Sequence, residues 1–216
     1  MSFLVCNYPM SDFESMVREY LVANKAEEFS TSDLCGVFYT DGGSRVIKST
    51  NYGGWGIHGY LYVDKTTNSN SGCKKAVPTT TGYTTGKIDP KDTKAFVTTY
   101  IDYYGSVIDN STNNKAELLG MIKCLYLIKQ LKLKHSIIYA DSKYVLGTIE
   151  GRETYKNNGF KTAAGKELAN VEMCQSMIEM YDEVSEEFDI DLRWVKGHSG
   201  NYGNEMADSN ATKGCY

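Results

Sequence analysis

The sequence predicts an α/β fold in which a mixed five-stranded sheet carries helices on both faces. Its apolar patterns occur in the order three strands, helix, strand, helices, strand and helix. The first three strands follow one another without a helix, as in an antiparallel arrangement, whereas the later strands alternate with helices, as in a parallel one. The fourth strand, at 136–140, is short and largely apolar, which is typical of a parallel strand in the middle of a sheet.

Individual elements follow from apolar periodicity and from turn residues. The expected strands lie at 36–40, 55–63, 95–108, 136–140 and 189–195, and the expected helices at 113–131, 142–149, 169–184 and 203–212. Residues 41–44 (DGGS) come directly after the first apolar run and predict a turn. Residues 64–94 are rich in Thr, Ser, Asn, Gly and Lys, have a net charge of +3, and predict a loop insertion that is either functional or mobile.

The first 35 residues differ from the rest and predict an acidic helical extension to a main domain at 36–216. A capping box begins at Ser11, and an apolar stripe begins at Phe13. This helix is expected to pack either on the main domain or on a protein partner. The whole chain has a net charge of −4, and residues 1–35 account for all of it. The main domain is therefore neutral overall, and its charge does not exclude a polyanionic partner, because local patches decide such binding.

Composition excludes several classes of protein. With 41% apolar and 23% charged residues the chain is globular rather than disordered. No apolar run reaches the roughly 18 residues that a membrane helix needs, and residues 1–10 lack the features of a secretory signal. The six cysteines contain no CxxC pair, so they are expected to be reduced thiols in a cytoplasmic protein without a membrane partner.

Four acidic residues occupy positions that suit a metal site. Asp41 and Asp141 each follow an expected strand, Glu117 lies inside an apolar helix, and Asp208 lies in the last helix. Converging carboxylates raise one another's pKa unless a cation neutralises them, and oxygen-only ligands favour Mg²⁺ or Mn²⁺. The alternative is that Asp41 and Asp141 are ordinary turn residues. The apolar neighbours of Glu117 weigh against it, because Glu is rarely buried without a partner.

Four local strings resemble motifs of the type 1 ribonuclease H family, and they occur in the family's order. They are residues 39–44 (YTDGGS), 112–118 (TNNKAEL), 139–145 (YADSKYV) and 194–200 (WVKGHSG), the last followed by 203–208 (GNEMAD). The resemblance covers roughly residues 36–213. It implies a ribonuclease H-like fold and an endonuclease that hydrolyses the RNA strand of RNA–DNA hybrids by two-metal-ion catalysis. The products would carry 5′-phosphate and 3′-hydroxyl ends.

The resemblance also assigns the catalytic roles. Asp41, Glu117, Asp141 and Asp208 would be the ligands of two Mg²⁺ ions, for which Mn²⁺ would substitute. His198 lies on a loop between Gly197 and Gly200 and would assist proton transfer or product release.

Further positions are assigned to the hybrid duplex by the same resemblance. Gly42, Asn113, Asn114 and Lys143 would contact the RNA strand, although Lys143 stands where relatives often have Gln. Thr112 and Asn170 would bind a DNA phosphate. A basic and aromatic segment at 152–166 would hold the DNA strand, with Tyr155 and Phe160 in place of the family's tryptophans. The residues of that segment that would bind the substrate are Tyr155, Lys156, Phe160 and Lys161.

Two other functions remain open on the sequence. One is a DNA-cutting enzyme of the same fold, such as an integrase, a transposase or a Holliday-junction nuclease, which would cleave an all-DNA duplex. The other is an inactive module that binds hybrids without cutting them. Such modules usually lack at least one carboxylate, whereas all four are present in this chain.

Overall fold

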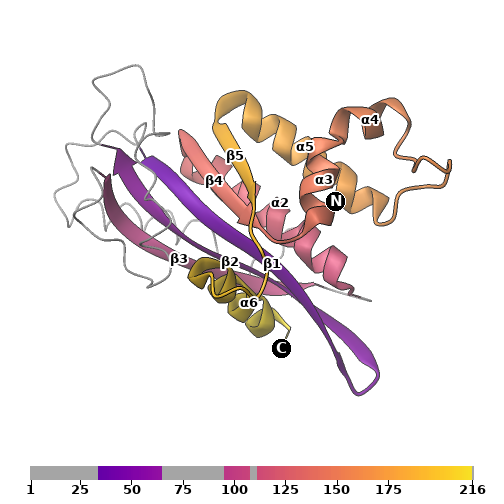
Figure 1. Cartoon of the computed structure of the whole chain (residues 1–216), viewed down its shortest axis with the longest axis horizontal. Helices are drawn as coiled ribbons and strands as arrows, with labels where there is room; N and C mark the ends of the chain where they lie inside the picture. Colours follow the sequence, from indigo (N-terminus) through magenta and orange to yellow (C-terminus); the bar gives the residue numbers. More distant parts are fainter. Residues whose placement is uncertain (1–33, 65–94, 108–110, 216) are drawn as a thin grey trace.

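The computed structural model describes residues 34–64, 95–107 and 111–215 (Figure 1). The expected helix that begins at Ser11 and nearly all of the expected loop at 64–94 lie outside these residues. None of the helices in the described ranges is long and apolar enough to cross a membrane.

A mixed five-stranded sheet forms the centre of the molecule, as the sequence predicts. Its strands are β1 (Leu34–Ile47), β2 (Thr50–Asp64), β3 (Ala95–Val107), β4 (His135–Ala140) and β5 (Asp189–Trp194). They lie in the order β3-β2-β1-β4-β5. β1 and β2, like β2 and β3, are antiparallel, whereas β1 and β4, like β4 and β5, are parallel. The first and fourth strands are therefore neighbours, and Ala140 at the end of β4 lies beside Thr40 in the middle of β1.

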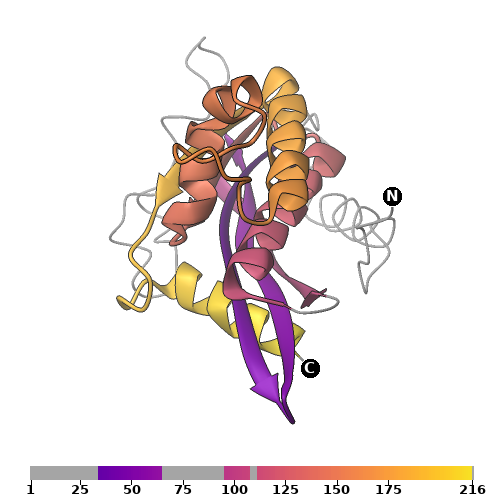
Figure 2. The same cartoon turned by 90° about the vertical axis from the view of Figure 1, so that its right-hand side faces the viewer.

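The helices are α2 (Asn113–Leu131), α3 (Lys143–Glu150), α4 (Arg152–Asn157), α5 (Val171–Glu187) and α6 (Tyr202–Gly214). Figure 2 shows α2, α3 and α5 on one side of the sheet and α6 on the other. The main core lies under α2, where Phe38, Trp55, Leu118 and Leu125 are fully buried. α4 forms within the segment that the sequence assigned only as basic and aromatic.

The turn predicted at 41–44 is wrong, because β1 continues through these residues. Asp41 pairs with Gly56 and Gly43 with Gly54, so β2 supplies a partner for the whole stretch. The chain turns instead at Lys48 and Ser49, whose φ angles of 48° and 67° are left-handed. Asp41 therefore lies inside a strand rather than at its end.

Glycines let two helices lie directly on the strands that carry the site. A Cβ atom on Gly54 or Gly56 would lie 2.1 Å from the Ala211 carbonyl oxygen or 2.2 Å from the Ala207 carbonyl oxygen, both in α6. On the opposite face, a Cβ atom on Gly42 would lie 2.2 Å from the Glu117 backbone nitrogen in α2. Such contacts exclude any side chain, so α2 and α6 approach the two faces of the sheet closely beside Asp41.

The expectation of six reduced thiols is wrong. Cys35, fully buried in β1, is disulfide-bonded. Cys124, Cys174 and Cys215 are buried free thiols, as predicted. Burial raises the pKa of the Cys124 thiol, which keeps it protonated and unreactive.

Candidate active site

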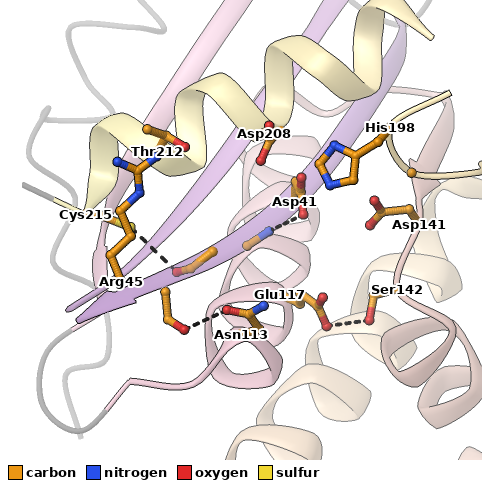
Figure 3. Close-up of a pocket in the computed structure, with 14 residues that line it drawn as sticks. Asp41, Arg45, Asn113, Glu117, Asp141, Ser142, His198, Asp208, Thr212 and Cys215 are labelled. Atoms are coloured by element: carbon orange, nitrogen blue, oxygen red, sulfur yellow. Dashed lines mark hydrogen bonds between the residues drawn. The ribbon is translucent and has the colours of Figure 1, made fainter. Parts of the chain in front are cut away.

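The four predicted carboxylates line one pocket of about 470 Å³ (Figure 3). Asp41 comes from β1, Glu117 from the first turns of α2, Asp141 from the residue after β4, and Asp208 from α6. The parallel pairing of β1 with β4 and the close approach of α2 and α6 bring these four elements together. His198 lines the same pocket, from the loop between β5 and α6.

Asp41 is the most buried of these acids, with 9% of its surface exposed. The Gly42 backbone N–H donates a hydrogen bond of 2.7 Å to its Oδ1 atom. Burial and the nearby charges of Asp141, Asp208 and Glu117 together raise the pKa of Asp41 to about 8, although the hydrogen bond from Gly42 lowers it. A buried carboxyl group among three others therefore holds its proton near neutral pH in the absence of a cation.

Glu117 is held by the residue that begins the next helix. The Ser142 hydroxyl donates a hydrogen bond of 2.6 Å to Glu117 Oε2. The same hydroxyl oxygen accepts a hydrogen bond from the Val145 backbone N–H and thus caps α3. Burial raises the pKa of Glu117 and Asp141 adds to this effect, while the bond from Ser142 opposes it. Ser142 thus fixes the direction of this carboxylate.

Asp141 is held from two sides. The Asn204 side-chain amide, almost fully buried in α6, donates a hydrogen bond of 3.3 Å to Asp141 Oδ2. From the loop before α6, Gly197 approaches so closely that its Cβ atom would lie 2.4 Å from the same oxygen. The Trp194 indole N–H donates to the Asp141 backbone oxygen. These contacts fix the position of the Asp141 carboxylate at the end of β4.

His198 lies on a strained loop beside the acids. Its φ of 49° is left-handed, which is uncommon for a residue with a side chain, and Gly200 has a φ of 80°. In Figure 3 its imidazole points into the space between Asp208 and Asp141. The ring is therefore within the pocket without belonging to any regular element.

The donor set of the pocket fits a divalent cation. In the ranges that the structure describes, no three His, Cys, Asp or Glu side chains are already arranged as a metal-ligand set. The four acids nevertheless offer only oxygen atoms, which Mg²⁺ and Mn²⁺ prefer. Their mutual repulsion, visible in the raised pKa of Asp41, is the unfavourable term that a bound cation would remove.

Some predicted substrate residues lie at the pocket and others do not. Gly42 and Asn113 line it, and the Ser44 hydroxyl donates a hydrogen bond of 2.6 Å to Asn113 Oδ1. Thr112 caps α2 by accepting a hydrogen bond from the Lys115 backbone N–H. Asn114 is exposed at the start of α2 and does not line the pocket.

Lys143 and Asn170 also lie outside the pocket lining. The Lys143 ammonium group is 5.1 Å from the centre of the exposed Trp194 ring, an arrangement typical of a cation–π contact. Asn170 precedes α5 in a left-handed conformation with φ of 56°.

None of the residues 152–166 of the basic segment lines the pocket, and α4 lies far from α6, which carries Asp208 (Figure 1). Lys156 Nζ lies 2.5 Å from Asp182 Oδ2 and 3.1 Å from Glu153 Oε1, and these hydrogen bonds raise the pKa of Lys156. Asp182 also pairs with Arg152 at 3.1 Å. Two of the segment's cations thus already have acidic partners.

The rest of that segment is more open. Tyr155 and Phe160 are half-buried, whereas Lys161 and Lys166 are exposed. No ion pair of either lysine is found within the described residues. The positive charge of the segment that is open to a ligand is therefore concentrated at Lys161 and Lys166.

Several residues of the pocket are missing from the sequence-based prediction. Ser44, Arg45, Ser142, Thr212 and Cys215 also line it. Ser44 lies in the quoted string 39–44 but was given no role, and Arg45 lies beyond that string, because the first strand was expected to end at residue 40. Ser142 was within a quoted motif, and its place as the residue before a helix is the signal that identifies it as a cap.

Comparisons with known proteins show the family of the chain. The family model described as RNase H matches residues 35–216. A protein named ribonuclease H from Francisella tularensis subsp. novicida is 45% identical over 114 residues, which are 52% of this chain and 70% of that protein. Ribonuclease H from Francisella philomiragia is 43% identical over 106 residues, which are 48% of this chain and 65% of that protein.

Solved structures are similar in fold. The PFV RNase H domain superposes with a TM-score of 0.56 at 22% identity, covering 84% of this chain and 94% of that one. LC9-RNase H1, a type 1 RNase H with the type 2 active-site motif, gives a TM-score of 0.58 at 19% identity, covering 84% of this chain and 72% of that one. At these identities the likeness concerns the fold alone.

Proposed function

Since this chain belongs to the ribonuclease H family, we propose that the pocket around Asp41 is where it cleaves its substrate, with two divalent cations. As a ribonuclease H the protein is a hydrolytic endoribonuclease that acts on RNA–DNA hybrids, and such enzymes are in general metal-dependent. To this family activity the proposal adds which residues act, which metal they bind and which ends the products carry. The metal is Mg²⁺, with Mn²⁺ as a substitute, and the products carry 5′-phosphate and 3′-hydroxyl ends.

One observation carries the assignment: four carboxylates from four different elements line a single pocket, and burial among them raises the pKa of Asp41 to about 8. A purely structural cluster would be expected to include a cationic partner, because unpaired buried acids are unfavourable. The hydrogen-bond donors described for these carboxylates are neutral, namely the Gly42 N–H for Asp41, the Ser142 hydroxyl for Glu117 and the Asn204 amide for Asp141.

The side chains of this chain then have distinct roles. Bound divalent cations would supply positive charge to the attacking water and to the leaving oxygen. Asp41, Glu117, Asp141 and Asp208 would hold these ions. Ser142 would keep Glu117 directed into the pocket through its 2.6 Å bond, and Asn204 would do the same for Asp141.

His198 is proposed as the residue that moves a proton at the leaving oxygen or assists product release. Among the residues that line the pocket, His198 carries the one imidazole, a side chain that can both accept and donate a proton. Its loop position outside any regular element leaves room for it to move with the product.

The duplex would lie across the pocket and the starts of α2 and α3. Gly42 and Asn113 at the pocket, with Asn114 and Lys143 beside it, would contact the RNA strand, whose 2′-hydroxyls face a shallow minor groove. Thr112 and Asn170 would bind a DNA phosphate, and the segment with Tyr155, Lys156, Phe160 and Lys161 would hold the DNA strand. The exposure of Lys161 supports this part most directly.

We also propose that residues 36–216 form the ribonuclease H domain with an insertion at 64–94. Residues 1–35 would form an acidic helical extension that binds a protein partner, since its charge would repel a duplex. Limited proteolysis of the full chain should release a fragment that begins near residue 36. A first cut inside one of the described helices would contradict this boundary.

A cleavage assay tests the proposed function. The same labelled RNA sequence is presented as an RNA–DNA hybrid, as an RNA duplex and as a single strand, next to a matching DNA duplex, with and without Mg²⁺. We expect cleavage of the hybrid alone, only with Mg²⁺ or Mn²⁺, and 5′-phosphate ends on the products. Cleavage of the DNA duplex would indicate a DNA-cutting enzyme, and tight hybrid binding without turnover would indicate a binding module.

A further inference from the structure

A buried polar network joins α6 to the sheet behind the pocket. His58 in β2 and Asp102 in β3 are paired residues, and His58 Nδ1 lies 2.9 Å from Asp102 Oδ1. The bond from His58 is the main reason that the pKa of Asp102 lies below its usual range. The carboxylate is therefore ionised and accepts hydrogen bonds on that oxygen.

Asn210 of α6 completes the network. Its side-chain amide donates a hydrogen bond of 2.7 Å to Asp102 Oδ1 and another of 3.0 Å to the Ile57 backbone oxygen. Its own carbonyl oxygen accepts a hydrogen bond from Lys213 Nζ at 3.0 Å. Asn210 has no exposed surface, so every hydrogen-bonding group of this side chain is used inside the protein.

A second contact holds the start of the same helix. The Tyr202 ring meets the His58 ring edge to face, with 5.6 Å between ring centres. Tyr202 is the first residue of α6, and Asn210 lies near its end. Along α6, Asp208 therefore lies between Tyr202, which contacts His58, and Asn210, which binds Asp102.

Asp208 itself has no such support. In the described part of the chain its side chain makes no hydrogen bond or ion pair, unlike Glu117 and Asp141. The close contacts of α6 with Gly54 and Gly56 fix its distance from the sheet. They are non-directional, whereas hydrogen bonds weaken steeply when their angle changes. Beside the bond from Asn204 to Asp141, the network thus adds directional contacts that oppose rotation or sliding of α6.

We infer that Asn210, held by Asp102 and His58, is a positioning residue that sets Asp208 for metal binding. The inference rests on the proposed function, because it concerns the same four acids. Partners of this kind typically change metal affinity or activity by about 10- to 100-fold when removed. A leucine at this site would fill a similar volume but would leave the rotation of the helix unspecified.

The test compares the full-length Asn210→Leu variant with the wild type in two measurements. The first is the Mg²⁺ concentration that gives half-maximal cleavage of the hybrid. The second is the rise in Tm that Mg²⁺ produces without substrate, which reports metal binding alone. We expect the half-maximal Mg²⁺ concentration to rise by about tenfold and the Mg²⁺-induced rise in Tm to shrink. The KM for the hybrid at saturating Mg²⁺ should stay within about twofold, since no residue of the network lines the pocket.

A second pair of variants keeps the inference testable if Asn210→Leu does not fold. The Asp102 side chain is 45% exposed, so the strand tolerates its replacement. Asp102→Leu should raise the Mg²⁺ requirement in the same way. Asp102→Asn keeps an acceptor oxygen for Asn210 and should restore most of the wild-type behaviour.

Thr148→Val is the matched control. It removes one buried polar group, the Thr148 hydroxyl, which donates to the Tyr144 backbone oxygen in α3, away from Asp208. It should lower Tm without changing the Mg²⁺ midpoint. If Asn210→Leu and Asp102→Leu also left both Mg²⁺ measurements unchanged, or if Thr148→Val shifted them equally, the network would be structural only and the inference would be wrong. A wild type that cleaves no hybrid would instead refute the proposed function, while the Tm measurement would still decide the role of Asn210.

Discussion

The carboxylate pocket and the segment around α4 differ in what holds their polar side chains. In the pocket, Glu117 accepts a hydrogen bond from Ser142 and Asp141 accepts one from Asn204. Both donors are neutral and belong to neighbouring elements of the same site. Around α4, Lys156 is fixed by Asp182, an acid of α5 that would compete with a nucleic-acid phosphate for it.

This difference shows that charge in a sequence is not the same as charge available to a ligand. The acids of the pocket remain without a cationic partner in the described part of the chain, so their charge is available to metal ions. The lysine of α4 is already neutralised, and only the outer residues of that segment offer free charge. The following predictions test this contrast, from the largest expected effect to the smallest.

Asp41→Asn should lower Mg²⁺-dependent cleavage of the hybrid by roughly 10³-fold or more, since a metal ligand contributes several kcal/mol to the transition state. The amide has nearly the same shape, so the fold should be unchanged. Turnover per enzyme is measured at saturating hybrid and Mg²⁺, with circular dichroism as the control for folding. A variant that kept more than about a tenth of the wild-type rate would refute a metal-dependent role for Asp41.

His198→Ala should slow turnover by roughly 10²-fold or less, the size expected for loss of a group that moves a proton. The Mg²⁺ concentration for half-maximal rate should not change, because His198 is not proposed as a ligand. Rates across a Mg²⁺ titration distinguish these effects. A large increase in the Mg²⁺ requirement would make His198 a ligand instead.

Gly42→Ala should reduce activity by about tenfold and lower Tm by roughly 5 °C, because overpacking of this kind costs about 1–3 kcal/mol. The added Cβ atom would lie 2.2 Å from the Glu117 backbone nitrogen and would displace α2. Gly43→Ala is the matched control, since a Cβ atom there meets nothing within 4 Å. Equal effects of the two substitutions, in rate or in thermal melting, would contradict the close packing described for Gly42.

The stability of the metal-free protein should depend on pH through Asp41. Its pKa is about 8 in the folded protein and 3.8 ordinarily, so between these values the folded state holds a proton that the unfolded state has lost. Stability from this group is therefore present below pH 4 and falls as the pH rises to about 8.

Asp41→Asn removes this dependence. Its Tm in EDTA should exceed that of the wild type by an amount that grows between pH 5 and pH 8, reaching about 10 °C. A constant difference across this range would mean that Asp41 titrates normally.

Lys161→Gln should raise the KM for the hybrid by about two- to fivefold. It should also reduce the slope of log affinity against log salt concentration by about one, the loss of one phosphate contact. Lys156→Gln should change both quantities less, because Asp182 and Glu153 already hold that ammonium group. Binding is measured by fluorescence anisotropy at several salt concentrations. If Lys156→Gln had the larger effect, the ion pair with Asp182 would have to open when the duplex binds.

The sequence predicted the parts of this protein that depend on local pattern. The order of the strands and the range of α2 were predicted because each has its own apolar periodicity. The four acids were found because each lies in a short string that resembles a family motif. The outer half of β1 was missed, since its pairing depends on glycines in β2 that lie nearby only after folding.

Contacts between distant residues were beyond prediction from sequence. The bond between Asn210 and Asp102 joins residues 108 positions apart, and neither lies in a quoted motif. Similarly, nothing in the basic segment at 152–166 indicates that Asp182 will pair with two of its cations. These features arise from the side-by-side placement of elements rather than from any local pattern.

Because β1 continues without interruption through the pocket, the number of residues before Asp41 decides which face of the sheet its carboxylate reaches. Alternate residues of a strand reach opposite faces, so Asp41 points toward α6 and Gly42 toward α2. Inserting or deleting one residue between Leu34 and Thr40 would shift the pairing register of β1 by one residue. Each shifted side chain would then point to the opposite face of the sheet. The carboxylate would then meet the backbone of α2, where even a Cβ atom has no room. Changes of length should therefore be tolerated only at the hairpin end, around Lys48 and Ser49, where extra residues would extend the turn and leave the spacing before Asp41 intact.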